Sequence, residues 1–176
     1  MTLPTRADIN VHDSLDERAA CDNFLGKTLE EAEALFAENA LYYQEALMHM
    51  GPAAFRFYVE AAIRYIRATH DDAMVFAFAG VLECRLEFDR PEMVPIASRL
   101  AAICRYILEH SAECGIPQTR AEIEAEAQML RNVMRSFDVD DVLGKDFNAE
   151  RFVDLRRRYE VLRDAILQML EENRTT

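Results

Sequence analysis

The sequence predicts an all-α fold, a single domain in which about six or seven helices form a bundle-like array. Three observations lead to this prediction. The 176 residues are 51% hydrophobic but include only five Gly and five Pro, a composition that favours helices. Apolar residues recur at intervals of three and four rather than two, which is the helical period. Capping signals separate these apolar stretches and mark where helices begin.

The capping signals set the expected order of elements. Residues 1–13 are expected to form a flexible tail, and residues 14–176 the single helical domain. Three capping boxes predict helix starts: Ser14 with Glu17, Thr28 with Glu31, and Thr119 with Glu122. Gly51 is expected in the left-handed conformation that ends one helix, and Pro52 in the first turn of the next. Further caps are expected from Asp71 or Asp72 and from Asn148.

Four apolar stripes predict the faces that pack into the core. They are Phe55, Tyr58, Val59, Ala62, Ile63 and Ile66; Ile96, Ala97, Leu100, Ile103, Cys104, Ile107 and Leu108; Ile123, Leu130, Val133, Met134 and Phe137; and Phe152, Leu155, Tyr159, Leu162, Ile166 and Leu170. The segment 74–82 is apolar on nearly all sides, so it is expected to be the central helix.

Charge and cysteine usage limit the class of partner and the compartment. The formal net charge is −12, and residues 1–50 hold ten acids against three bases, a local charge of −7. Such a chain repels nucleic acid and anionic lipid, so we expect neither as a ligand and expect a basic protein instead. The four cysteines show no Cys-x-x-Cys spacing, no signal peptide is recognisable, and no apolar run approaches the roughly 20 residues of a membrane span. The expected location is the cytoplasm.

Tests for catalytic and metal-binding motifs leave one enzymatic alternative. An EF-hand alignment from Asp138 fails because Leu143 and Ala149 fall where Gly and Glu are required. The order of His49, His70-Asp71 and Asp138 resembles that of the all-helical HD-type metal phosphohydrolases, which keeps a metal-dependent hydrolase as an alternative. No nucleophile motif or glycine-rich phosphate loop is present. We therefore expect no cofactor, no metal ion and no catalytic residue.

Arg85 is a charged residue on an apolar helical face. At 100° per residue it falls among Met74, Ala77, Phe78, Val81 and Phe88. A buried guanidinium needs a partner, so Arg85 is expected either to form a buried ion pair with an acid on a neighbouring helix or to line an anion pocket.

The stretch 42–66 holds the first set of candidate partner-binding residues. Tyr42, Glu45 and His49 fall on the side of their helix opposite Phe36 and Leu47, and Phe57 projects away from the core stripe of the next helix. Exposed aromatic residues beside charges are typical of protein interfaces. A covering helix is the alternative. The acidic loop residues Asp138, Asp140, Asp141 and Asp146 form a second candidate set.

A resemblance adds to this interpretation. The segments "FLGKTLEEAEALFAENALYYQEALMHMGPAAFRFYVEAAIRYI" and "RLEFDRPEMVPIASRLAAICRYILEH", within residues 24–110, resemble small uncharacterised bacterial all-helical proteins of toxin/immunity-type loci. The resemblance implies an immunity or adaptor role and no catalytic residues. We expect a non-enzymatic cytoplasmic protein that masks a basic toxin or effector. A structural homo-oligomer, such as a homodimer, is a further alternative.

Overall fold

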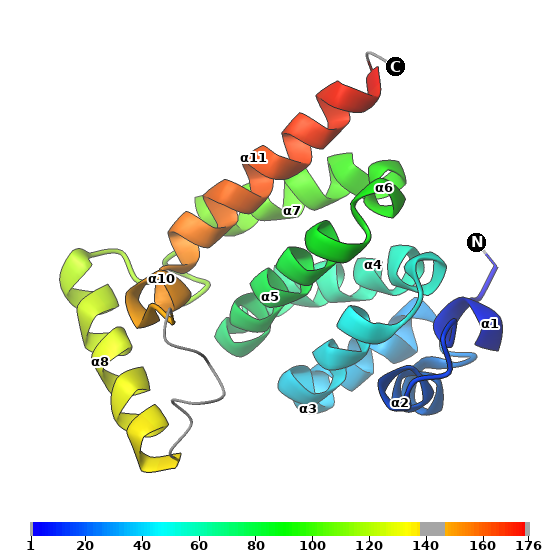
Figure 1. Cartoon of the computed structure of the whole chain (residues 1–176), viewed down its shortest axis with the longest axis horizontal. Helices are drawn as coiled ribbons and strands as arrows, with labels where there is room; N and C mark the ends of the chain where they lie inside the picture. Colours follow the sequence, from blue (N-terminus) through cyan, green and yellow to red (C-terminus); the bar gives the residue numbers. More distant parts are fainter. Residues whose placement is uncertain (1, 138–146, 175–176) are drawn as a thin grey trace.

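The computed structural model of the chain describes residues 2–137 and 147–174 (Figure 1). These residues form helices and no strand, so the predicted all-α fold is confirmed for the described part of the chain. In chain order the helices are α1 (Arg6–Ile9), α2 (Leu15–Phe24), α3 (Leu29–His49), α4 (Pro52–Thr69), α5 (Asp72–Phe88), α6 (Arg90–Met93), the 3-10 helix η1 (Val94–Ile96), α7 (Ala97–Glu109), α8 (Arg120–Phe137), α10 (Ala149–Val153) and α11 (Leu155–Arg174).

Helices α2, α3, α5 and α8 begin where the capping signals predict, and Asn148 caps the short helix α10 rather than the last helix. The Ser14–Glu17 and Thr28–Glu31 boxes open α2 and α3 with both reciprocal hydrogen bonds. Thr119 and Glu122 do the same for α8, at 3.2 and 3.0 Å. Asp71 caps α5 by accepting the Met74 amide at 2.7 Å. Local sequence therefore determines these starts, because each cap uses residues only three positions apart.

The main core lies between two pairs of helices that α5 connects. α3 packs on α4, α7 packs on α11, and α5 contacts both α3 and α11 (Figure 1). The prediction that residues 74–82 lie centrally is confirmed, because Met74, Val75, Phe78 and Leu82 are at most 1% exposed. Tyr159 connects α11 to α5, since its buried hydroxyl donates a hydrogen bond to the Val75 carbonyl at 2.6 Å.

Residues 2–13 differ from the predicted flexible tail. They contain the short helix α1, which packs against α4 and buries Ile9 completely. The Gly51 amide donates to the Ile9 carbonyl at 2.9 Å. A capping box of Thr5 and Asp8 begins α1, and this pattern in the sequence was the signal that the tail prediction passed over.

Gly51 has a different role from the predicted one. Its φ is −58°, so it is not in the left-handed conformation. A Cβ at this position would lie 2.5 Å from Val11 Cγ2 and closer still to the Asp8 carbonyl oxygen. Gly51 is therefore required by the close approach of the α1 segment, a tertiary contact that the local sequence does not reveal.

Helix α8 packs away from the main core. Its Ile123, Ala127 and Leu130 form a small separate cluster with Phe147, Ala149 and Val153 from the α10 region. In Figure 1, α8 lies at the far end of the molecule from the N-terminus, with α10 between it and α11. Of the predicted apolar stripe of α8, Ile123 and Leu130 thus pack on a five-residue helix rather than on the bundle, and Val133 is 48% exposed.

Candidate functional site

The structure brings three of the four hairpin candidates together on one face. Tyr42, Glu45 and His49 are exposed residues along the second half of α3, and they line a narrow groove between α3 and α2. Asp16 and Asn23 of α2 line its opposite wall, and the groove has a volume of about 50 Å³. We call these five residues the α2–α3 face. Because the floor consists of alanines, Ala19, Ala20 and Ala46, a partner can approach both helices closely.

A local break in α3 positions this face. Asn39 has non-helical dihedral angles (φ −157°, ψ 89°), and its side chain accepts the Tyr42 amide at 3.1 Å. Asn39 thus caps the second half of α3 as an N-cap residue does. Leu41 and Tyr42 follow the break and are 55% and 54% exposed. The Tyr42 ring packs edge-on against Tyr43, with ring centroids 4.9 Å apart, which leaves its outer side open to solvent.

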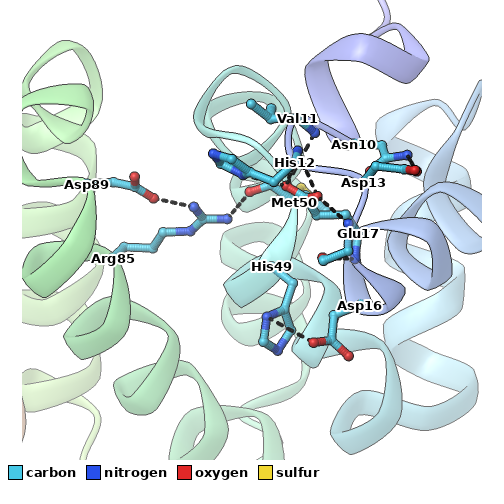
Figure 2. Close-up of polar contacts among 11 residues, drawn as sticks. Asn10, Val11, His12, Asp13, Asp16, Glu17, His49, Met50, Arg85 and Asp89 are labelled. Carbon is cyan, nitrogen blue, oxygen red and sulfur yellow. Dashed lines mark hydrogen bonds and ion pairs between the residues drawn. The ribbon is translucent and has the colours of Figure 1, made fainter.

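The face is acidic and only partly paired. His49 Nδ1 lies 3.9 Å from an Asp16 carboxylate oxygen, the contact drawn in Figure 2. Both side chains are largely exposed, at 43% and 66%. Glu45 makes no side-chain hydrogen bond or ion pair with the described part of the chain. The face therefore offers one unpaired carboxylate and one weakly engaged carboxylate on opposite walls of the groove.

The fourth hairpin candidate, Phe57, is not exposed. Its side chain is only 9% accessible and packs edge-on against Tyr58 at a centroid distance of 4.9 Å. It lies in a different groove, between residues 2–5 and the start of α7. The expectation that Phe57 is exposed is wrong because residues 2–13, expected to form a flexible tail, pack on this side of α4. The loop candidates Asp138, Asp140, Asp141 and Asp146 lie outside the described residues.

Arg85 is paired, and the acid belongs to its own helix. The residue is 3% exposed, and its side chain bonds the carboxylate of Asp89, the C-cap residue that follows α5 (Figure 2). It also donates to the Leu47 carbonyl at 2.9 and 2.7 Å, and to the Met50 carbonyl. Its guanidinium lies 4.7 Å from the centre of the Phe55 ring. Burial lowers the pKa of Arg85, and the bond to Asp89 opposes this shift.

These contacts give Arg85 a structural role. The carbonyls of the last helical turn lack partners within their own helix, and basic side chains can satisfy them. Arg85 does this for the end of α3, just before the sharp turn into α4. The guanidinium thus joins α5 to the α3–α4 turn rather than facing an anion pocket.

The residues of the HD-type alternative are not gathered. His49 ends α3 and His70 follows α4, so the 18 residues of α4 separate them, about 27 Å along the axis. His70 Nε2 lies 2.6 Å from the Tyr106 hydroxyl, and Asp71 is used as the α5 cap. Asp138 lies outside the described residues. Among the described residues, no group of three His, Cys, Asp or Glu side chains is placed to hold a metal ion.

Glu17, which the sequence predicts only as the capping-box partner of Ser14, makes further hydrogen bonds near the face. Glu17 is 4% exposed and accepts the backbone amides of Val11, His12 and Ser14, as Figure 2 shows in part. Burial raises the pKa of Glu17, but the hydrogen bonds to Ser14, His12 and Val11 outweigh it and lower the pKa to about 2. Glu17 therefore fixes the α1–α2 turn from which α2, with its Asp16, begins.

Comparison of the chain with protein-family models, curated proteins and solved structures gives no match. None of the described helices is long and apolar enough to cross a membrane.

Proposed function

We propose that the chain is a non-enzymatic protein-binding protein that receives a basic segment of a toxin or effector on the α2–α3 face, as a cytoplasmic immunity-type inhibitor would. The observation that carries this proposal is the grouping of exposed Tyr42, unpaired Glu45 and Asp16 around one groove. Resemblance to proteins of toxin/immunity-type loci supports the same class of function.

The chemistry of the groove fits an arginine or lysine side chain. Carboxylates on both walls, Glu45 from α3 and Asp16 from α2, can accept hydrogen bonds from one guanidinium. The exposed ring of Tyr42 offers a face for a cation, a contact worth about 0.5–1 kcal/mol at an exposed site. Tyrosine and arginine are also the residues most often found at the centre of tight interfaces.

The charge of the first 50 residues adds a longer-range effect. Their net charge of −7 attracts a basic protein before contact and raises the association rate. Since salt screens such attraction beyond about 8–10 Å, the rate should fall with ionic strength.

Site-specific photo-cross-linking in the host cell tests the proposal. A photo-reactive phenylalanine analogue replaces Tyr42 in one variant and Val161 of α11 in the control. Both positions are about equally exposed, at 54% and 51%, and they belong to α3 and α11, two helices that lie apart in Figure 1. We expect position 42 to give one discrete adduct that mass spectrometry identifies as a basic protein, and position 161 to give none with that protein.

Two outcomes would contradict the proposal. Adducts of the same protein from both positions would show that contact at position 42 is non-specific. An adduct between two copies of this chain would show that the face forms a homo-oligomer instead of binding a toxin or effector.

A further inference from the structure

Four arginines line a cavity at the opposite end of the molecule from the α2–α3 face. The cavity has a volume of about 450 Å³ and lies where the start of α8, α10 and the start of α11 meet. Arg120 comes from α8, Arg151 from α10, and Arg156 and Arg157 from α11. Figure 1 shows these three helices side by side at this end. The packing of α8 on α10 brings Arg120 beside the arginines of residues 151–157.

The acids of the cavity are already engaged. Glu150 bonds two guanidiniums, Arg120 at 2.8 Å and Arg131 at 3.3 Å. Asp154 accepts the backbone amide of Arg157 at 3.1 Å and so caps α11. Glu160 lies 3.6 Å from Arg157. These three carboxylates are the acids that line the cavity, so its four arginines leave a surplus of one positive charge.

Arg151 and Arg156 are the two arginines of the cavity without a carboxylate partner among the described residues. Arg156 donates to Ser111 Oγ at 2.6 Å and to Gln118 Oε1 at 2.9 Å, and both partners are neutral. These two bonds fix the guanidinium in place without compensating its charge. Arg151 is exposed and makes no side-chain hydrogen bond or ion pair with the described part of the chain. One guanidinium is thus pre-oriented, and a second has no partner among the described residues that would keep it from contacting a ligand.

We propose that this cavity binds a small oxyanion with two or more negative charges, of the diphosphate or polycarboxylate class. Planar guanidiniums bind phosphate and carboxylate oxygens in pairs, and four of them from three helices surround one volume. A chain of net charge −12 repels anions in general, so binding must come from this local arrangement. The site shares no residue with the α2–α3 face, and its test is independent of the proposed inhibitor function.

A ligand in this cavity would also hold α8 in place. α8 contacts the rest of the described chain mainly through α10, and its apolar cluster is small. An anion that bonds Arg120, Arg151 and Arg156 connects α8, α10 and α11 directly. Binding is therefore expected to raise the unfolding temperature of the protein as well as to release heat.

Calorimetric titration of the full chain with pyrophosphate and with citrate, at constant ionic strength set by sodium chloride, tests the proposal. We expect saturable one-to-one binding of at least one anion, and the tighter of the two assigns the phosphate or the carboxylate class. Arg156→Gln and Arg151→Gln should each weaken binding about tenfold or more, the usual effect of losing a charge-assisted hydrogen bond. Arg105→Gln is the matched control, since it removes the same charge from an exposed position on α7.

Arg151→Gln keeps the test decisive if Arg156→Gln does not fold, because the Arg151 side chain makes no hydrogen bond or ion pair with the described residues. Absence of saturable binding of either anion would overturn the proposal. Equal weakening by Arg105→Gln and Arg151→Gln would also overturn it, since the effect would then reflect net charge alone.

Discussion

Replacing Arg85 by methionine should destabilise the protein far more than the loss of its ion pair with Asp89 alone would. Methionine keeps the unbranched stem but removes the donors to the Leu47 and Met50 carbonyls. Both residues are fully buried, and a buried carbonyl that loses its donor costs about 1–3 kcal/mol. The Asp89 carboxylate loses its partner too, while the thioether is cheaper to bury than a guanidinium. We expect a net loss of about 3 kcal/mol.

Arg64→Met is the matched control. Arg64 lies near three carboxylates, those of Glu30, Glu33 and Glu60, at 3.3, 3.4 and 3.5 Å, but its side chain is 43% exposed. Exposed ion pairs contribute about 0–1 kcal/mol because water and salt screen them. If ion-pair number decided stability, Arg64 would matter more than Arg85. If buried carbonyl partners decide it, the order is reversed.

Urea unfolding followed by circular dichroism measures both variants. With a slope of about 2 kcal/mol per molar urea, the midpoint of Arg85→Met should fall by about 1.5 M. The midpoint of Arg64→Met should fall by less than about 0.5 M. A loss below about 1 kcal/mol for Arg85→Met, or an equal loss for Arg64→Met, would refute the assignment of Arg85 as the residue that holds the end of α3.

Three further predictions address packing, pH and thiol reactivity. Gly51→Ala should destabilise the fold by about 2 kcal/mol or more in urea unfolding, because the added Cβ would meet the α1 segment. Gly80→Ala should be neutral or stabilising, because the nearest contact of its added Cβ would be at 3.8 Å. Equal effects of the two substitutions would contradict the contact argument. The folded pKa of Glu17 is about 2 against an ordinary 4.5, so the stabilisation by Glu17 is complete above pH 4.5 and is lost as the pH falls toward 2. Glu17→Gln should therefore flatten that part of the stability–pH curve. An unchanged curve would exclude a stabilising role for the hydrogen bonds of Glu17. Burial raises the pKa of Cys104 to about 12 and that of Cys114 to about 11. At pH 8 neither thiol should therefore react rapidly with a disulfide reagent before the protein unfolds. Rapid labelling of either thiol in the native protein would show that the packing around it is open.

The local part of the fold could be predicted from the sequence. Capping boxes at Ser14, Thr28 and Thr119 work through residues three positions apart, so no knowledge of the tertiary structure is needed. The same pattern at Thr5 was available but was assigned to a tail, because a four-residue helix has no apolar period of its own. The requirement for glycine at position 51 could then not be predicted, because it depends on the position of α1. An apolar stripe likewise predicts that α8 packs, but not that α10 is its neighbour.

Of the candidate site, the wall formed by α3 could be predicted from the sequence, whereas the wall formed by α2 could not, because it depends on tertiary packing. Helical periodicity placed Tyr42, Glu45 and His49 on one side of α3, and the structure keeps them exposed there. The other wall, Asp16 and Asn23, depends on the register between α2 and α3, which a single sequence does not contain. Periodicity also put Phe57 outside the core stripe, but the side chain is buried because a distant segment packs on it.

The association rate of the partner identified through position 42 tests the central claim most directly. Stopped-flow rates are measured at increasing ionic strength for the native chain, Glu45→Lys and Glu109→Lys, where Glu109 is an exposed acid of α7. We predict that the native rate falls steeply with salt and that Glu45→Lys slows association, shortens the lifetime of the complex and reduces the salt dependence, while Glu109→Lys changes much less. Equal effects of the two reversals would contradict binding at the α2–α3 face.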